Sequence, residues 1–383
     1  MSNAPTTDEV VARARALAPA LAARAEECER LRRVPDATIA DYLEGGFHRM
    51  VQPARYGGYE MGWGSLAATA AEFGVGCASQ GWVLTVYGDH AQMVSIFPAE
   101  AQDEVWSADP RTLIATSFAP MGKATPSGGG VVVSGRWGFS SGIDHAKWLI
   151  AGAMLDGKFI YVLVPKAQAQ VIDDWHVAGL AGTGSKSFVM TDVFVPPHRI
   201  ITESDANDGI APGTKINTAP VYRYPRKGAG VALAAVPVGA ASGMLADFSA
   251  LCRDRTKRGR RAAAGAMDAL RVAEGESDMA AARALLAETA RDIEARLARG
   301  ETLDVEARSV ARRNPAYAVM LACRTVDRLM ASAGGNAIYR SNRLQRAFRD
   351  VHAAASHIGF SWEMSAGPFG QWALGYEVEK GTY

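Results

Sequence analysis

The sequence has few cysteines, almost no net charge and no long hydrophobic run, and each shortage excludes a class of protein. Its four cysteines form no C-x-x-C pair, so they indicate neither a zinc knuckle nor a disulfide framework: Cys28, Cys77, Cys252 and Cys323. The 41 Lys and Arg residues against 40 Asp and Glu residues leave a formal charge of +1. A nucleic-acid-binding protein needs a clear basic excess, so that class is excluded. The longest apolar run, Val231–Ala241, is broken by Pro237 and falls short of the ~20 residues of a membrane span.

The N-terminal segment carries acidic residues and no apolar core of a signal peptide, so we expect a cytoplasmic protein with reduced cysteines and no membrane segment. The chain has 383 residues, 48% of them hydrophobic, which predicts two or three domains with ample core. Its near-zero charge is compatible with burial of surface in an oligomer.

Helical patterns dominate roughly the first 110 residues. Thr6-x-x-Glu9 has the form of a capping box, and apolar residues follow it at helical spacing. Pro35 begins a second short helix, which Gly45 and Gly46 end. Three more helices are expected over Ser65–Phe73, Gln80–Ile96 and Ala99–Ser107.

The middle of the chain is typical of β-structure. Short runs rich in β-branched and aromatic residues predict five strands, at Leu113–Phe118, Val131–Trp137, Trp148–Met154, Phe159–Val164 and Ser187–Val195. Asp156-Gly157 between two of them is a hairpin signal. Strands at this spacing without intervening helices predict a small β-barrel or sandwich rather than a Rossmann sheet.

Helical character returns after a connector that ends at Pro225. Long stretches over Asp278–Arg299, Leu303–Ser332 and Arg343–His357 predict an antiparallel bundle. The expected fold is therefore α+β in three parts: an N-terminal helical domain over residues 1–110, a central β-barrel over 111–210, and a helical bundle over 211–383.

The sequence contains partial matches to two known loop motifs, a dinucleotide-binding glycine pattern and the nucleophile elbow of hydrolases. Glycine patterns at Gly62–Ala67 and Gly74–Ser79 do not follow strands, and no phosphate-binding P-loop occurs, so the chain lacks a nicotinamide site of its own. Gly138–Gly142 satisfies G-x-S-x-G, which leaves a hydrolase with Ser140 as nucleophile as an alternative. That elbow needs a helix after the serine, whereas a strand follows here, so hydroxyls and amides facing a flat cofactor are favoured.

The remaining candidates each have a structural and a functional interpretation. His352 and His357 lie five residues apart, about 140° around a helix, which does not form a metal pair. His90 follows Trp82 on an apolar stretch and is either a core histidine or functional. The glycine-rich segments Gly179–Ser185 and Gly334–Tyr339 are either tight turns or cofactor contacts. The basic run Arg253–Arg261 is either a solvated helix face or a phosphate site.

Several segments together resemble the acyl-CoA dehydrogenase superfamily over nearly the whole chain, roughly Arg13 to Gly375. They are Gly81-Trp82-Val83 with His90, Ser134–Gly142, Gly182–Ser185 with Val193–Pro196, and Leu344–His352. The sequence is most similar to the flavin-dependent monooxygenases of that superfamily, which are oxygenase components of two-component aromatic hydroxylases. The resemblance implies the helix–barrel–bundle order, a homotetramer, and a separate NAD(P)H–flavin reductase as partner.

In such hydroxylases, reduced FMN or FAD reacts with O2 to form a C4a-hydroperoxide, which hydroxylates a small phenolic or polycyclic substrate. The resemblance implies Ser141 at flavin N5, with the other cofactor contacts at Ser117, Trp137, Ser140, Thr183, Arg258, Gly334 and Gly335. It implies His90 at the substrate hydroxyl, Trp82 and Phe118 against the ring, and His357 near the flavin or the reacting oxygen. The roles of the two histidines are interchangeable at this point, as are FMN and FAD.

Two other activities share this fold. An acyl-CoA dehydrogenase needs a carboxylate base within a loop resembling Tyr-Glu-Gly-Thr, which this chain lacks; Glu363 is the nearest substitute. Oxygenation at nitrogen or sulfur is the second alternative, and His90 favours a hydroxylated aromatic ring over it.

Overall fold

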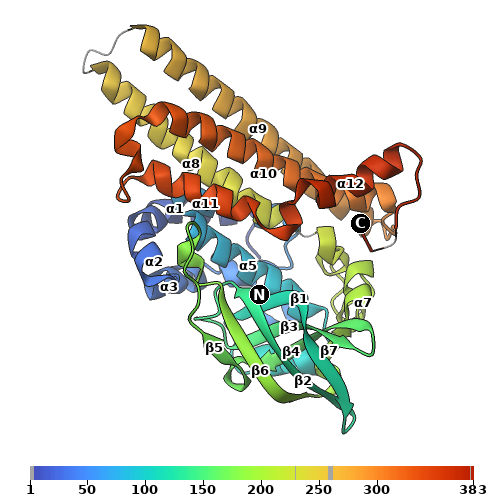
Figure 1. Cartoon of the computed structure of the whole chain (residues 1–383). Helices are drawn as coiled ribbons and strands as arrows, with labels where there is room; N and C mark the ends of the chain where they lie inside the picture. The colour runs from blue at the N-terminus through green and yellow to red at the C-terminus, as the bar shows by residue number, and fades with distance from the viewer. Residues whose placement is uncertain (1–3, 229, 258–261, 380) are drawn as a thin grey trace.

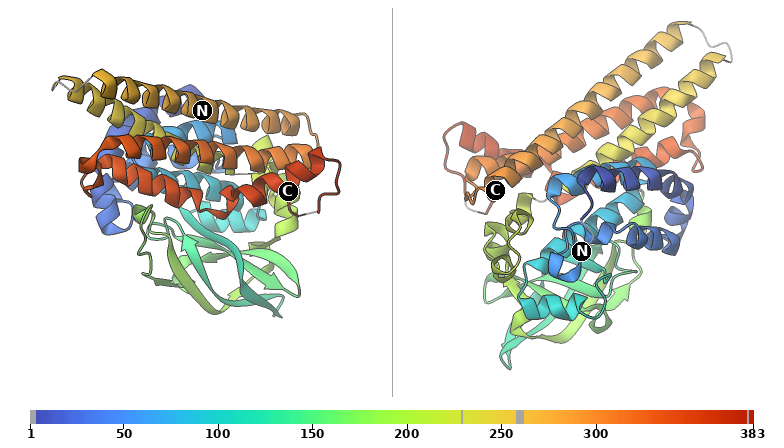
Figure 2. Two further views of the ribbon diagram at one scale, coloured as in Figure 1. Left: turned by 45° about the horizontal axis from the view of Figure 1, so that its top comes forward. Right: turned by 180° about the vertical axis from the view of Figure 1, so that it is seen from behind.

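Helices form two layers over a single sheet (Figure 1). The computed structural model describes residues 4–228, 230–257, 262–379 and 381–383. The N-terminal helices are α1 (Thr7–Ala23), α2 (Ala25–Leu31), α3 (Asp36–Glu44), α4 (Trp63–Gly76), α5 (Ala78–Ser95) and α6 (Ala99–Trp106). After the sheet follow α7 (Glu203–Asp208), α8 (Gly230–Lys257), α9 (Ala262–Ala298), α10 (Val305–Ala333), α11 (Arg343–Ala355) and α12 (Trp362–Ala373). In Figures 1 and 2 the N-terminal helices lie between the long C-terminal helices and the sheet.

The sheet has seven strands: β1 (Ile114–Ser127), β2 (Gly130–Ser140), β3 (Trp148–Leu155), β4 (Lys158–Pro165), β5 (Gln170–Ile172), β6 (Lys186–Val195) and β7 (Ile200–Thr202). Their order is β5-β6-β2-β1-β3-β4-β7, with β1 and β3 parallel and the other pairs antiparallel. The predicted hairpin is confirmed, because Asp156 and Gly157 join β3 to β4 with φ of 47° and 79°. This two-residue turn is of type I′.

The predicted barrel is wrong in one respect: the sheet stays open. Its two edge strands, β5 and β7, have three residues each and are not paired with each other. Strands this short provide too few backbone groups to close a barrel by a further ladder. The order of helices, sheet and helices is confirmed, whereas the boundaries near residues 110 and 210 stay predictions.

The helical predictions are largely confirmed, and their ends have physical causes. Thr6 caps α1 in a capping box with Glu9, as expected from the sequence. Pro35 precedes α3. No bounds of helix α8 were set from the sequence, where Pro237 was noted only as a break in an apolar run; in the structure the helix continues through Pro237. Residues Gly230–Asp254 are long and apolar enough to cross a membrane, but 78% of their most apolar window is buried inside the protein.

Two hydrophobic cores hold these layers together. One extends from Val10 to Phe360 and joins the N-terminal helices with α8, α9, α10 and α11. The other fills the sheet and includes Trp137 and Phe188. Helix α5 lies between β1 and α8, and all its residues are buried. Its polar side chains therefore need partners within the protein, and this requirement shapes the candidate site.

Candidate active site

The buried histidine of α5 has a partner at each ring nitrogen. The Nδ1 atom of His90 lies 2.7 Å from the carbonyl oxygen of Ile114, and its Nε2 atom lies 2.7 Å from the hydroxyl of Thr116. A carbonyl can only accept, so Nδ1 carries the proton and Nε2 accepts from the threonine. Burial lowers the pKa of His90 to about 4, so the ring is neutral. Thr116 donates its only hydroxyl proton in this bond, so the lone pairs of its oxygen remain available to a further donor.

An irregularity in β1 brings an aromatic wall beside this pair. The register of β1 against β3 moves from Ser117↔Ala151 to Gly122↔Ala153, so five steps on β1 match two on β3. Phe118 lies in the extra segment and meets the His90 ring edge-on, with centroids 6.0 Å apart. Tyr161 of β4 packs on the other side of Phe118 at 5.5 Å.

A charged pair covers the same aromatic ring. Arg226, in a short 3-10 turn before α8, donates from both terminal nitrogens to the carboxylate of Asp89, at 2.8 Å for Nη2 to Oδ2. Its guanidinium carbon lies 4.1 Å from the centre of Phe118. The pair is largely buried, with 15% and 13% of the two side chains exposed. Its charges cancel, so the pocket presents no free ion from this pair.

Two turns earlier on α5, Trp82 reaches a cluster of hydroxyls at the end of β2. The indole nitrogen of Trp82 donates to Ser141 Oγ at 3.2 Å, and Ser141 Oγ lies 2.7 Å from Ser185 Oγ. Backbone bonds fix the turn after Ser141: Gly142 donates to the carbonyl of Thr183 at 3.0 Å and accepts from the hydroxyl of Tyr87 at 2.6 Å.

The second expected histidine lies against Trp82. The ring of His357 is 5.6 Å from that of Trp82, and its Nδ1 accepts from the backbone N–H of Gly359 at 3.1 Å. Nε2 therefore carries the proton and is a donor. The surrounding protein lowers the pKa of His357 to about 4 by desolvation, yet its surface is exposed. His357 therefore lies at the protein surface, with its ring against the buried Trp82.

The two ends of this site are joined by one helix. Trp82 and His90 are eight residues apart on α5, which corresponds to about 12 Å along the axis. One end offers hydroxyls, an indole and an imidazole donor; the other offers a neutral histidine, a threonine and aromatic rings. The candidate site thus has two chemically different ends, joined by α5.

Comparison with known proteins settles the family. The family models for the acyl-CoA dehydrogenase N-terminal and C-terminal domains match residues 5–109 and 231–362. The chain is 36% identical over 375 residues to the flavin-dependent monooxygenase oxygenase subunit HsaA of Rhodococcus jostii, covering 95% of this chain and 97% of that protein. The chain belongs to the acyl-CoA dehydrogenase family. Within it, it is a flavin-dependent monooxygenase of the oxygenase-component type.

Two further relatives cover the chain from end to end. The FADH(2)-dependent resorcinol hydroxylase oxygenase component of Rhizobium sp. is 36% identical, over 100% of this chain and 99% of that protein. The crystal structure of 3-HSA hydroxylase from Rhodococcus sp. RHA1 has a TM-score of 0.94 at 35% identity, and the match covers 99% of this chain and 100% of that one.

The structure brings half of the expected monooxygenase residues together, and three of the others lie in or beside the sheet with their side chains committed to different surroundings. Trp137 is fully buried in the sheet core, stacked on Phe188 at 5.1 Å, and its indole donates to Gly152. The hydroxyl of Ser140 is buried without a partner, which also removes it as a hydrolase nucleophile. Ser117 donates to the carbonyl of Gly138 and so ties β1 to β2.

The candidates for a phosphate or an adenine tail lie outside this site. Gly334 and Gly335 are exposed between α10 and α11, and His357 follows the other end of α11, about 20 Å away along the 13 residues of that helix. Arg258 lies outside the described residues. Glu363, the substitute base of a dehydrogenase, is exposed in the first turn of α12.

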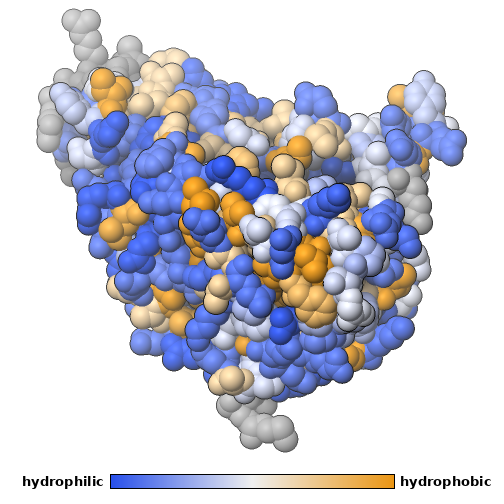
Figure 3. All heavy atoms as spheres, turned by 60° about the horizontal axis from the view of Figure 1, so that its bottom comes forward, coloured by the Kyte–Doolittle hydropathy of each residue, from blue (hydrophilic) through white to orange (hydrophobic). Residues whose placement is uncertain are grey.

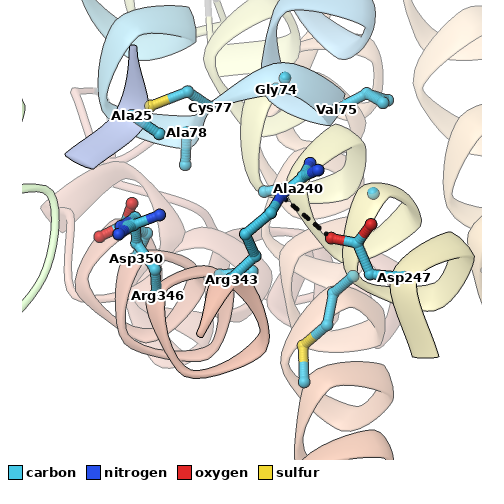
Figure 4. Close-up of a pocket in the computed structure, with 14 residues that line it drawn as sticks. Ala25, Gly74, Val75, Cys77, Ala78, Ala240, Asp247, Arg343, Arg346 and Asp350 are labelled. Carbon is cyan, nitrogen blue, oxygen red and sulfur yellow. Dashed lines mark ion pairs between the residues drawn. The ribbon is translucent and has the colours of Figure 1, made fainter. Parts of the chain in front are cut away.

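A small hollow of about 40 Å³ lies where α11 and α8 face the end of α4 and the start of α5 (Figure 4). Asp350 and Arg346 project from α11 towards it, and Arg343 pairs with Asp247 at 3.2 Å across its edge. Asp350 is buried and accepts from the backbone N–H of Leu180 at 2.7 Å. Desolvation raises its pKa to about 6, although that hydrogen bond acts in the opposite direction.

Sequence reasoning missed Asp89, Thr116, Tyr161, Ser185 and Arg226. Ser185 was part of a recognised motif and Asp89 adjoins His90, so those two had a local signal. Thr116, Tyr161 and Arg226 reach the site only because of the β1 irregularity and the turn before α8. No local sequence pattern predicts either feature.

The residues present fit a flavin. Ser141 keeps 8% of its surface exposed at the end of a strand, where a Cβ on Gly142 would lie 2.6 Å from the Tyr87 oxygen, so the chain there is pressed close to its neighbours. Phe139, with φ of 59° and 78% exposed, packs edge-on against Trp175 beside it. A serine hydroxyl and an imidazole N–H near an exposed aromatic ring suit a flat heterocycle with polar edges.

Proposed function

We propose that this chain is the oxygenase component of a two-component hydroxylase that adds one oxygen atom of O2 to an uncharged phenol. The bound reduced flavin, FMNH2 or FADH2, supplies the activated oxygen. A separate NAD(P)H-dependent reductase supplies the reduced flavin, and the reaction is cytoplasmic. The observation that carries the proposal is the Thr116–His90 pair beside Phe118. This pair lies about 12 Å along α5 from Trp82, which bonds Ser141.

The pair gives a path for the phenolic proton. A free lone pair of the Thr116 oxygen accepts the hydrogen bond of the substrate hydroxyl, and the threonine proton is already directed to Nε2 of His90. A neutral imidazole of low pKa is a weak base, so through Thr116 it draws the proton away from the phenol oxygen without binding that proton permanently. Electron density in the ring rises at the carbon beside the hydroxyl, where oxygen is added.

The other end of the site controls solvent and protons. We assign Ser141, Trp82 and Thr183 to the flavin edge, and the Nε2–H of His357 to the place where the oxygen is activated. Trp82 and Phe118 are the aromatic walls that exclude water between the two ends, which favours oxygen transfer over release of hydrogen peroxide.

The Asp89–Arg226 pair supports an uncharged substrate. Both terminal nitrogens of Arg226 are bound to the carboxylate of Asp89, so this guanidinium is not free to pair with a substrate acid. We expect 4-ethylphenol to react with kcat/KM at least about tenfold above 4-hydroxyphenylacetate, the cost of one uncompensated charge in a poorly solvated pocket. Equal values would contradict the assignment of an uncharged substrate.

Exposed apolar side chains support a homo-oligomer, and the resemblance to tetrameric enzymes favours four copies. Ile338 and Tyr339, beside Gly334 and Gly335, are 72% and 65% exposed. A hollow of about 460 Å³ beside α10 is lined in part by Met320 and Phe360. Figure 3 shows that apolar patches also interrupt the polar surface on the side of the sheet. Light scattering after size exclusion tests the tetramer; a monomer at micromolar concentration contradicts it.

The decisive experiment mixes the protein anaerobically with chemically reduced FAD or FMN and a phenol, then adds 18O2. We expect a catechol that carries one 18O atom, and little hydrogen peroxide. His90→Ala should lower the yield of catechol per flavin by about 10²-fold or more. The matched control is His48→Leu, which removes another buried histidine of low pKa whose ring nitrogens have no partner. Complete conversion of reduced flavin to hydrogen peroxide by the wild type would refute the function.

A further inference from the structure

A line of hydroxyl groups continues from Ser141 into the protein interior. Ser141 Oγ lies 2.7 Å from Ser185 Oγ, and Ser185 Oγ lies 2.7 Å from Thr183 Oγ1. The line ends at the carbonyl oxygen of Leu180, 2.8 Å from Thr183 Oγ1. At its other end, Trp82 Nε1 approaches Ser141 Oγ at 3.2 Å. Both ends are therefore groups whose role in a hydrogen bond is invariable.

The two ends set the direction of every proton between them. The carbonyl can only accept, so the single hydroxyl proton of Thr183 goes to Leu180. Ser185 must then donate to Thr183, and Ser141 must donate to Ser185. The indole can only donate, so Trp82 occupies one lone pair of Ser141. Ser141 is left with one lone pair and no free proton.

The loop that carries this line is held rigidly. The carboxylate of Asp350 accepts from the backbone N–H of Leu180, and Arg349 of the same helix α11 donates to the carbonyl of Ala178. Thr183 and Ser185 are 1% and 5% exposed, so water does not compete for their hydroxyls. Reversal of the proton direction would leave the Leu180 carbonyl without its bond from Thr183.

We infer that Trp82, Ser185 and Thr183 are positioning residues that hold Ser141 as a hydrogen-bond acceptor, and thereby select reduced flavin over oxidised flavin. Reduced flavin carries a hydrogen at N5 and donates there, whereas N5 of oxidised flavin only accepts. An acceptor facing N5 matches the first form and opposes the second. The inference rests on the proposed function, because that function places Ser141 at the flavin edge.

One mismatched hydrogen bond corresponds to about a tenfold difference in affinity. We therefore expect the wild type to bind reduced flavin at least about tenfold more tightly than oxidised flavin. Tighter binding of the reduced form raises the two-electron midpoint potential of the bound flavin, by about 30 mV for each tenfold of that ratio. The ratio and the potential are measured without substrate and without turnover.

The test is an anaerobic titration of the wild type and variants with oxidised and reduced FAD and FMN. Ser185→Ala and Thr183→Val free the Ser141 proton to turn towards N5, so oxidised flavin should bind more tightly and the ratio should fall about tenfold. Thr183→Ser keeps the hydroxyl and should keep the wild-type ratio. Ser95→Ala is the matched control: its buried hydroxyl donates to the carbonyl of Ala91 on α5, outside the site.

Folded variants with an unchanged ratio overturn the inference. Equal weakening of both oxidation states also overturns it, since that result indicates loss of packing rather than loss of hydrogen-bond direction. If Thr183→Val does not fold, the comparison of Ser185→Ala with Thr183→Ser still tests the inference. If the wild type hydroxylates a phenol but binds both flavins equally, only this inference fails. If it binds neither flavin, the proposed function fails as well.

Discussion

The buried histidines and Asp350 predict how the stability of this protein changes with acid. Desolvation lowers the pKa values of His48 and His90 from 6.5 to about 4, and raises that of Asp350 from 3.8 to about 6. Between pH 6.5 and 4 the unfolded chain protonates each histidine but the folded one does not, so stability is lost as pH falls. Asp350 acts oppositely: between pH 3.8 and 6 the folded chain keeps a proton that the unfolded chain releases, so stability is lost as pH rises.

The magnitudes follow from the proton difference. Each histidine contributes about 1.4 kcal/mol per pH unit in its window, and Asp350 subtracts about the same. The three groups together therefore lower the free energy of unfolding by about 3 kcal/mol from pH 6 to pH 4. His48 is the cleanest group to remove, because neither ring nitrogen has a partner and the replacement breaks no hydrogen bond.

The assay is urea unfolding of the wild type and His48→Leu, followed by circular dichroism at pH 8, 7, 6 and 5. Relative to the wild type, the variant should gain about 2 kcal/mol between pH 8 and pH 5, since only the wild-type unfolded state takes up that proton. Asp350→Asn keeps an acceptor for Leu180 and should show a steeper loss with acid than the wild type. Parallel curves for wild type and His48→Leu would refute the reasoning.

Three further substitutions test other parts of the fold. Gly142→Ala puts a Cβ 2.6 Å from the Tyr87 oxygen at a φ of 72°, and should lower the free energy of unfolding by about 2 kcal/mol in urea titrations; a neutral effect would contradict the close packing. Asp89→Asn leaves the buried Arg226 without a counter-ion and should cost about 3 kcal/mol, measured as a lower melting temperature; an unchanged melting temperature would contradict the burial of the pair. Thr6→Ala removes the capping box of α1 and should cost about 1 kcal/mol, seen as faster hydrogen exchange in its first turn only.

Local sequence patterns predicted helices, strands and turns well where a short run of residues strongly favours one conformation. The Thr6 capping box, the Asp156-Gly157 turn and the β-branched runs act over a few residues, and the structure confirms them. Helix α8 was harder, because Pro237 disfavours an isolated helix. Burial between α4, α9, α10 and α11 compensates for the lost hydrogen bond, and only the tertiary fold supplies that burial.

The residues of the candidate site also divide into those that the sequence marked and those that only tertiary contacts position. Resemblance in the sequence marked His90, Ser141 and His357, and the structure places all three along α5 and its neighbours. Trp137 lies in the sheet core instead. Successive side chains of a strand point to opposite faces of the sheet, so the position of Trp137 in β2 determines which face it occupies, and the sequence motif around it does not.

Three features of the composition carried much of the sequence analysis: few cysteines, little net charge and short apolar runs. The few cysteines, the near-zero net charge and the apolar run broken by Pro237 led to the expectation of no zinc or disulfide framework, no nucleic-acid partner and no membrane span, and the local patterns set the order of helices and strands. Only the tertiary structure decided that Arg226 neutralises Asp89, that Thr116 stands between His90 and the pocket, and that Ser185 directs the Ser141 proton. These contacts join residues 26 to 137 positions apart, and hydrogen-bond direction depends on the partner at each end, which no local stretch of sequence contains.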